Sequence, residues 1–407
     1  MQPIARFLKL AHAIREPIIH KKREHVLIVG YGKDQVSATH LAYLPTTQEI
    51  TIKKHRHYDT NKPDSLAQYV TRLSALENFK IIVGLESGMG RTIQSSAILI
   101  RKSPKEDIDE AELDDLVANA IWKIFDRERL QSARALNVSD VDVLLGDVKA
   151  VAVKLDGHRV INPVGFKAKS VEIILRQTYM PRLVYDALRR SIPFSKVALL
   201  EEAGVSFLQP LISSMRLPPN TPFSLAHIDQ EKVRIFDVHN LYIHPATVAS
   251  CGFNHFVNTC SSLYSFHPES FLNILNFSYG FSEDIKFKKA MRRHIGEWGN
   301  ELRDVLDQQM SGDQKSQRLL FTISGLHDDF FKDASQKINA QFININRDFI
   351  SRNFNFQIFP KAGTIDSEVM LACFLLFDWL SLPSVPFASK IVYRRVNWLV
   401  SGMHQQH

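Results

Sequence analysis

Residues that could bind a metal or act as nucleophiles are frequent in this chain, but their spacing matches no familiar catalytic motif. The sixteen histidines include no His-Glu-x-x-His pair and no pairing with carboxylates at ligand spacing. The three cysteines, Cys251, Cys260 and Cys373, show no Cys-x-x-Cys spacing, and such a sparse, odd set is typical of a reducing cytoplasm. We therefore predict no metal site and no catalytic residues.

A glycine-rich run, GLESGMG at residues 84–90, is a candidate for phosphate binding, because closely spaced glycines let a backbone approach an anion. The run lacks the Gly-Lys-Ser/Thr ending of a phosphate loop, so it is interpreted as a turn between two elements. Thr92, Ser95 and Ser96 follow it without the pattern of a nucleophile elbow.

The last residues of the sequence suggest binding to a surface rather than catalysis. Residues 390–407 read KIVYRRVNWLVSGMHQQH. At 100° per residue, a helix here gathers apolar side chains on one face, places cations opposite them and sets a tryptophan at the border. Such a helix is typical of one that lies in the plane of a membrane, although a helix docked on its own domain has the same pattern. The residues expected at the membrane are Lys390, Val392, Arg394, Arg395, Val396, Trp398 and Leu399.

Composition limits the class of protein. With 407 residues, 45% of them hydrophobic and 23% charged, the chain is globular rather than disordered and can bury one large core or two ordinary ones. The formal net charge of +7 favours an anionic partner, which could be lipid, nucleic acid or an acidic peptide. The most apolar run, residues 369–382, is short and contains Asp378, so it predicts a buried helix rather than a transmembrane one.

Strand and helix signals alternate through the body of the chain, which predicts an α/β protein. Asp109 and Glu112 form a capping box before a helix whose apolar residues recur at i, i+3 and i+4. The expected strands lie at 26–32, 49–58, 80–86, 95–102, within 142–160, at 170–179 and at 318–326; the expected helices lie at 66–76, from 109, from Pro181, within 256–310 and at 367–380.

The order of residues over 95–190 resembles FtsA, the actin-like cell-division protein of bacteria. The resemblance is carried by the strand ending at Asp156-Gly157, the Asn-Pro-Val-Gly turn at 162–165, the strand at 170–179 and the helix from Pro181. A similar order occurs in the pilus protein PilM. The resemblance implies an actin-like, ribonuclease H-like fold, with two α/β lobes around a nucleotide cleft and a strand–helix–strand–strand insert.

Together with the residues near its two ends, the resemblance divides the chain into six parts. They are an N-terminal basic amphipathic segment (1–24), a first lobe (25–82 and 179–200), the insert (83–178), a second, trimmed lobe (201–380), a linker (381–389) and an amphipathic membrane helix (390–407).

Actin-like proteins hold ATP with two hairpin turns and a glycine-rich adenine loop. The matching stretches here are VGYGKDQ (29–35), HIDQEKVR (227–234) and FTISGLH (321–327), with GFNHFVNT (252–259) beside them. Each departs from the family pattern: for example, Gly30 stands where aspartate is expected, and Asp229 where glycine is expected. The resemblance therefore implies a degenerate nucleotide site formed by Gly30, Gly32, His227, Asp229, Gly252, Thr322 and Gly325.

The resemblance therefore implies an FtsA-like adaptor that tethers division filaments to the cytoplasmic face of the cell membrane. The expected partners are an FtsZ-like tubulin homologue or other division proteins, the anionic inner membrane surface and a second copy of the chain, but no nucleic acid. No cofactor is expected, with weak binding of ATP and Mg²⁺ as the alternative. The rival functions are an active actin-like ATPase and a PilM-like pilus assembly platform.

Overall fold

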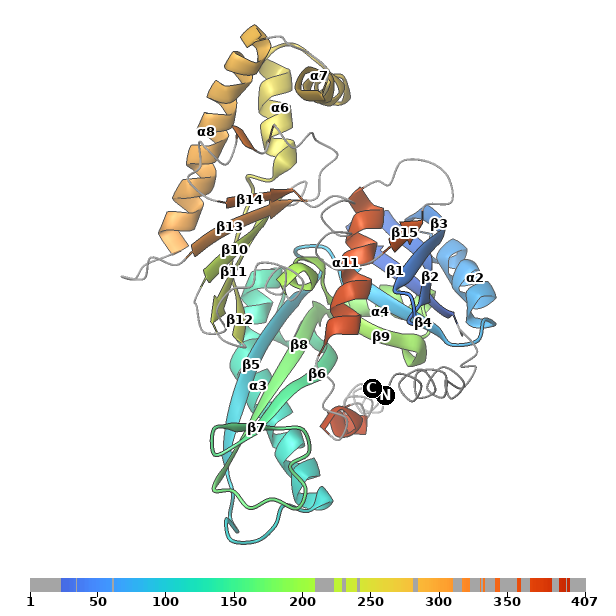
Figure 1. Cartoon of the computed structure of the whole chain (residues 1–407), viewed down its shortest axis with the longest axis vertical. Helices are drawn as coiled ribbons and strands as arrows, with labels where there is room; N and C mark the ends of the chain where they lie inside the picture. Colours follow the sequence, from blue (N-terminus) through green and yellow to red (C-terminus); the bar gives the residue numbers. More distant parts are fainter. Residues whose placement is uncertain are drawn as a thin grey trace, which may run out of the picture.

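Two β-sheets organise the chain in a computed structural model (Figure 1). The first has six strands in the order β15-β3-β2-β1-β4-β9, and the second has nine in the order β14-β13-β10-β11-β12-β5-β8-β6-β7. The structure describes residues 23–33, 35–60, 62–208, 223–228, 232–239, 242–280, 285–309, 317–322, 330, 332–333, 341–344, 357–359, 367–382, 388–392 and 394–395.

The elements have the following bounds in chain order. The strands are β1 (Glu24–Tyr31), β2 (Gln35–Leu44), β3 (Glu49–Asp59), β4 (Phe79–Leu85), β5 (Arg91–Ile100), β6 (Val143–Leu155), β7 (His158–Val160), β8 (Ser170–Pro181), β9 (Val197–Glu202), β10 (Phe223–Ile228), β11 (Val233–His239), β12 (Tyr242–Ala249), β13 (Gln317–Thr322), β14 (Gln341–Asn344) and β15 (Gln357–Phe359). The helices are α2 (Pro63–Ser74), α3 (Glu110–Leu136), α4 (Arg182–Ser191), α6 (Phe253–Leu263), α7 (Pro268–Gly280), α8 (Ile285–Gln309) and α11 (Ser367–Ser381), with short 3₁₀ turns η1 (Asp140–Asp142), η2 (Phe194–Lys196) and η3 (Ala203–Phe207).

One strand arrangement occurs twice. In the first sheet β1, β2 and β3 pair antiparallel, while β4 and β9 continue from β1 in parallel. In the second sheet β10, β11 and β12 pair antiparallel, while β13 and β14 continue from β10 in parallel. This duplication is the actin-like fold that the family resemblance implied. We call the first sheet with α2, α4 and α11 lobe I, and β10–β14 with α6–α8 lobe II.

The insert consists of β5–β8 and helix α3. Its strands continue the second sheet through a single pair, Ile243 of β12 opposite Gln94 of β5. The expected boundary at residue 178 falls inside β8, which runs without a break from the insert to the start of α4.

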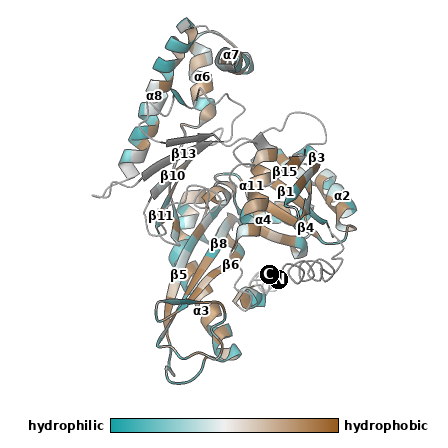
Figure 2. Ribbon diagram, in the orientation of Figure 1, coloured by the Kyte–Doolittle hydropathy of each residue, from teal (hydrophilic) through white to brown (hydrophobic). Residues whose placement is uncertain are grey.

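Lobe I buries both faces of its sheet, which explains why its central strands are apolar at nearly every position. Val26 and Ile28 of β1 pack toward α11, whereas Leu27 and Val29 pack toward α2 and α4. Figure 2 shows the hydrophobic colouring concentrated in this sheet and in α11.

Helix α3 begins as its sequence predicts, but only half of the expected capping box forms. The Asp109 carboxylate accepts a hydrogen bond from the backbone N–H of Glu112 at 2.7 Å. The Glu112 carboxylate accepts from Arg101 instead, whose Nε and Nη2 donate at 2.7 Å each. The apolar face of α3, which includes Leu113, Val117 and Ile121, is buried against β5, β6 and β8.

The Asp156-Gly157 turn that carried the family resemblance is a tight turn after β6. Both residues have positive φ, 46° and 87°, which glycine adopts freely and aspartate tolerates. The Asp156 carboxylate accepts hydrogen bonds from the backbone N–H groups of Lys169 and Ser170. These bonds lower the pKa of Asp156. The turn thus fixes the start of β8 against the end of β6.

Several elements differ from the sequence prediction, among them the short strands β14 and β15, which were not foreseen. The strand β2 was not foreseen, because Ser37, Thr39 and His40 interrupt its apolar pattern although most of its residues are buried. The helical stretch expected over 256–310 is three helices, α6, α7 and α8.

Candidate functional site between the lobes

The carboxyl ends of β1, β4 and β9 lie at one edge of the first sheet, because the three strands run in parallel. In open α/β sheets this edge is where ligands bind. The β10–β11 hairpin of lobe II approaches it: Lys232 Nζ lies 3.2 Å from where a Cβ on Gly88 would stand. The hairpins β1–β2 and β10–β11 thus flank a junction between the lobes, as the family resemblance implied.

A carboxylate from another part of the chain lies against the glycine in the turn between β1 and β2. Glu86 directly follows β4, and its backbone N–H donates to the carbonyl of Tyr31 at 3.0 Å. A Cβ on Gly32 would collide with the Glu86 carboxylate, so the absence of a side chain at Gly32 makes room for this carboxylate. An anionic group in this place repels phosphate unless a cation lies between them.

Two other predicted site residues have packing roles. A Cβ on Gly30 would lie 2.5 Å from Ser37 Oγ of the paired strand, so this glycine allows close strand packing. His227 is buried, with its ring centroid 5.1 Å from that of Phe207 in η3. The His227 ring therefore packs in the protein core.

A buried ion pair joins the two lobes. Arg234 on β11 lies beside Glu202 at the end of β9, with Nε and Oε1 2.8 Å apart and Nη2 donating to Oε2 at 3.1 Å. The Glu202 backbone N–H donates to Thr92 Oγ1 at 2.7 Å, which ties the insert strand β5 to the same point. Both charged side chains are at most 5% exposed, so removing either one would leave the other buried without a counter-charge.

Helix α3 is tied to this edge through a second cationic residue. Arg91, at the start of β5, donates from Nη1 to Ser132 Oγ at 2.9 Å and to Glu128 Oε2 at 3.4 Å. Burial lowers the pKa of Arg91, and the negative charge of Glu128 opposes that shift. These contacts hold α3 against the start of β5 within the insert.

A third buried cluster links β8, β9 and α11. Arg176 Nη1 donates to Glu201 Oε2 at 2.9 Å and to Asp378 Oδ2 at 2.6 Å, and Nε donates to Gln94 Oε1 at 3.1 Å. All three charged side chains are at most 2% exposed. Burial, together with the charge of Asp378, raises the pKa of Glu201, and burial likewise raises the pKa of Asp378. One cation faces two acids, so the cluster favours holding a proton.

The remaining predicted nucleotide residues contribute little that can be described. Gly252 is the N-cap of α6, and Thr322 is the last residue of β13. Asp229 and Gly325 lie outside the described residues. Sequence reasoning missed Glu86, Glu202 and Arg234. The signal for the two acids was available, since each ends a buried strand with a charged residue, in VGLE and VALLEE.

Polar and charged side chains occupy the described part of the junction. Gly30 and Gly32, where a backbone would have to approach phosphate, are covered by Ser37 and by the Glu86 carboxylate, and Arg234 is engaged by Glu202. Within the described part of the chain, no group of three or more histidines, cysteines or acids could hold a metal ion. The described groups are therefore buried ion pairs, which hold elements together, and the carboxylate of Glu86 after strand β4.

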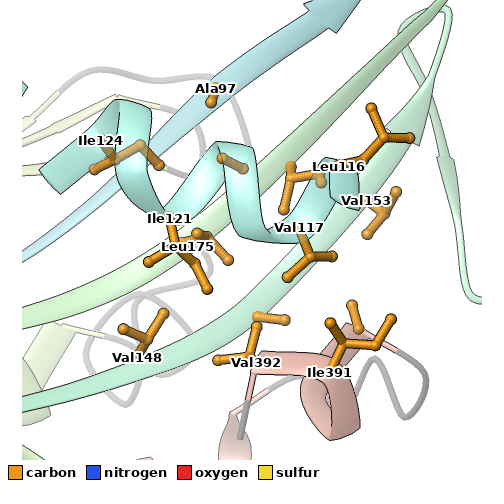
Figure 3. Packing of buried hydrophobic residues seen from close by; sticks show 14 of the residues in the cluster. Ala97, Leu116, Val117, Ile121, Ile124, Val148, Val153, Leu175, Ile391 and Val392 are labelled. Atoms are coloured by element: carbon orange, nitrogen blue, oxygen red, sulfur yellow. The ribbon is translucent and has the colours of Figure 1, made fainter. Parts of the chain in front are cut away.

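The residues predicted at the membrane are placed only in part. Residues 388–392 and 394–395, which we call the tail, are helical, and Ala388, Ile391 and Val392 are buried in the core of the insert (Figure 3). Arg394 and Arg395 form ion pairs with Asp114 of α3, and Lys390 is exposed. The tail has the docked arrangement that the sequence left open. Val396, Trp398 and Leu399 lie outside the described residues, and membrane contact stays a prediction.

No protein-family model matches the chain, and no curated protein matches it. Among solved structures, it is similar to a chain of the PilM–PilN type IV pilus biogenesis complex, with a TM-score of 0.49 and 14% identity over 91% of this chain and 99% of that one. It is also similar to a Bacteroides thetaiotaomicron protein with an actin-like ATPase fold, with a TM-score of 0.37 and 9% identity over 86% of this chain and 96% of that one. A third similarity is to the cytoplasmic domain of EpsL, an inner membrane component of the type II secretion system of Vibrio cholerae. Here the TM-score is 0.33, with 9% identity over 87% of this chain and 95% of that one. Function is therefore argued from the side chains.

Proposed function

We propose that this chain is an FtsA-related scaffold that tethers division filaments to the cytoplasmic face of the cell membrane and does not depend on ATP turnover. The observation that carries the proposal is the junction between the lobes, where Arg234 and Glu202 pair across it and Glu86 covers the turn at Gly32. A junction in which protein side chains pair with one another suits a rigid adaptor better than a nucleotide-driven one.

The energetics favour a fixed arrangement of the lobes. An ATPase of this fold would have to open and close around its nucleotide, a hinge motion that requires contacts between the lobes to break. Opening the junction would have to break both contacts between Arg234 and Glu202, and a hydrogen bond to a charged group contributes roughly 1.5–3 kcal/mol. We expect the lobes to remain together without a ligand.

Attachment to the membrane is assigned to residues 390–407. They combine a cationic side with an apolar side, and each cation near an anionic leaflet adds attraction of about 1 kcal/mol. In the described part of the chain, no helix is both long and apolar enough to cross a bilayer. An in-plane helix is therefore the mode of attachment that we propose.

A docking site for an acidic partner is supported by helix α8 of lobe II. Lys286, Lys289, Arg292 and Arg293 are exposed along its first turns. Arg292 and Arg293 pair with Asp333 and Glu297, but their exposure leaves them open to exchange of partners. An acidic peptide of a tubulin-like filament protein is the partner that we propose for this helix.

Two measurements test the proposal. Adding ATP and Mg²⁺ should leave the melting temperature unchanged, because a ligand that binds the native state stabilises it by RT ln(1 + [L]/Kd). In a co-sedimentation assay, FtsZ-type filaments should pellet with anionic vesicles in the presence of the full chain, but not in the presence of a chain ending at residue 387. A clear thermal shift together with phosphate release would favour the active ATPase. Vesicle binding without filament recruitment would instead favour an assembly platform of another kind.

A further inference from the structure

The insert presents one surface on which the tail rests, and we call it the insert face. It is formed by Leu116 and Val117 of α3 and Val148 and Val153 of β6, with Asp114 at its margin. Val392 is 1% exposed and Ile391 7%, and both share one buried cluster with these four apolar residues. In Figure 3, Ile391 and Val392 point from the tail toward Val117 and the strand side chains.

The contact also pairs charges. Asp114 accepts hydrogen bonds from both Arg394 and Arg395, and Arg395 also lies 3.8 Å from a carboxylate oxygen of Asp115. Burial by itself would raise the pKa of Asp114, but the bonds from the two arginines outweigh it and lower the pKa. Asp114 therefore carries its charge throughout the neutral range.

The insert face thus offers the tail the same two features as an anionic leaflet, an apolar layer edged by negative charge. A membrane would have to take up the same side chains, since an in-plane helix buries its apolar face and sets its cations among the headgroups. Val392 cannot be buried in the insert and in lipid at once. Docking and membrane binding are consequently alternatives.

We propose that the insert face is a docking site for the chain's own C-terminal helix and that it competes with an anionic membrane for that helix. The competition rests on the proposed function, because it supposes that residues 390–407 bind lipid. When the tail docks, the protein is held off the membrane. When a leaflet takes the tail, the insert face is uncovered.

The test uses the full chain and a matched pair of variants on α3. Asp114→Asn removes the carboxylate that both arginines share, whereas Asp126→Asn makes the same change at an exposed position farther along the helix. Weakening two partly exposed pairs should shift the docking equilibrium about threefold to tenfold. Hydrogen exchange of peptides covering 388–395, measured without lipid, should show protection in the wild type and in Asp126→Asn, and faster exchange in Asp114→Asn.

Vesicles of phosphatidylglycerol and phosphatidylcholine supply the second readout. Asp114→Asn should bind them about threefold to tenfold more tightly than the wild type, and Asp114→Arg at least as tightly as Asp114→Asn. Unprotected tail peptides in the wild type would overturn the docking itself. Equal vesicle binding by all four chains would overturn the competition while leaving the tether intact. If no chain binds vesicles, the proposed membrane attachment is wrong, and the competition that depends on it is wrong as well. The exchange data would still report the docked contact.

Discussion

Replacing Arg176 by methionine should strongly destabilise the protein, because it removes the one cation from a cluster of three buried charges. Glu201 and Asp378 would remain on β9 and α11 with no exposure and no counter-charge. Breaking a buried ion pair costs about 3–5 kcal/mol. For domains of this size each kcal/mol shifts the melting temperature by about 2–4 °C, so we expect a fall of roughly 6–20 °C.

The loss should also depend on pH in a defined direction. A carboxyl whose folded pKa is raised contributes full stability below its unfolded pKa, which is 4.5 for Glu201, and loses stability as pH rises above it. Removal of Arg176 raises both folded pKa values further, since the compensating charge is gone. The difference between variant and wild type should therefore widen from pH 4.5 to pH 7.

Differential scanning calorimetry at several pH values measures both effects. Arg159→Met, at an exposed position on β7, is the matched control and should melt within about 1 °C of the wild type, because surface substitutions seldom matter. The triple variant Arg176→Met/Glu201→Met/Asp378→Leu should recover most of the lost stability, because apolar residues often replace a buried ion cluster without cost. If Arg176→Met melts with the wild type at pH 7, the cluster is not buried as described.

Three further predictions test other parts of the structure. Ile121→Asp should cost several kcal/mol in urea unfolding, because it buries an unpaired charge, whereas Trp122→Asp, at a half-exposed neighbouring position, should cost much less; equal costs would contradict the facing of α3. Asp156→Asn should be less stable than the wild type above pH 4, with the difference lost as pH falls through the lowered pKa of Asp156; a difference unaffected by pH would point to the turn geometry alone. Val396→Glu should bind anionic vesicles nearly as weakly as a chain lacking 388–407, and retained binding would turn attention to the N-terminal segment.

Local features were predictable where neighbouring residues decide the structure. The helix of α3 follows from apolar residues at i, i+3 and i+4, and its start follows from Asp109 as N-cap. The turn at Asp156-Gly157 follows from residues that tolerate positive φ. Asp378 within an apolar helix signalled that this helix is buried in a protein core rather than in lipid, because a buried charge requires a partner.

The sequence by itself determined the alternation of strands and helices, and so an α/β fold, because the periods of apolar residues depend only on local geometry. Only the tertiary structure decided which charges meet. Asp378 finds Arg176 from 202 positions away, and Arg394 finds Asp114 from 280 positions away, distances that no local pattern encodes. The same limit applied to Gly32 and His227, whose surroundings come from Glu86 and Phe207 on other elements. A tail with an apolar and a cationic side fits an acidic protein face or an anionic leaflet equally well, and the packing of the insert settled where Val392 lies, because burial is a property of the assembled fold.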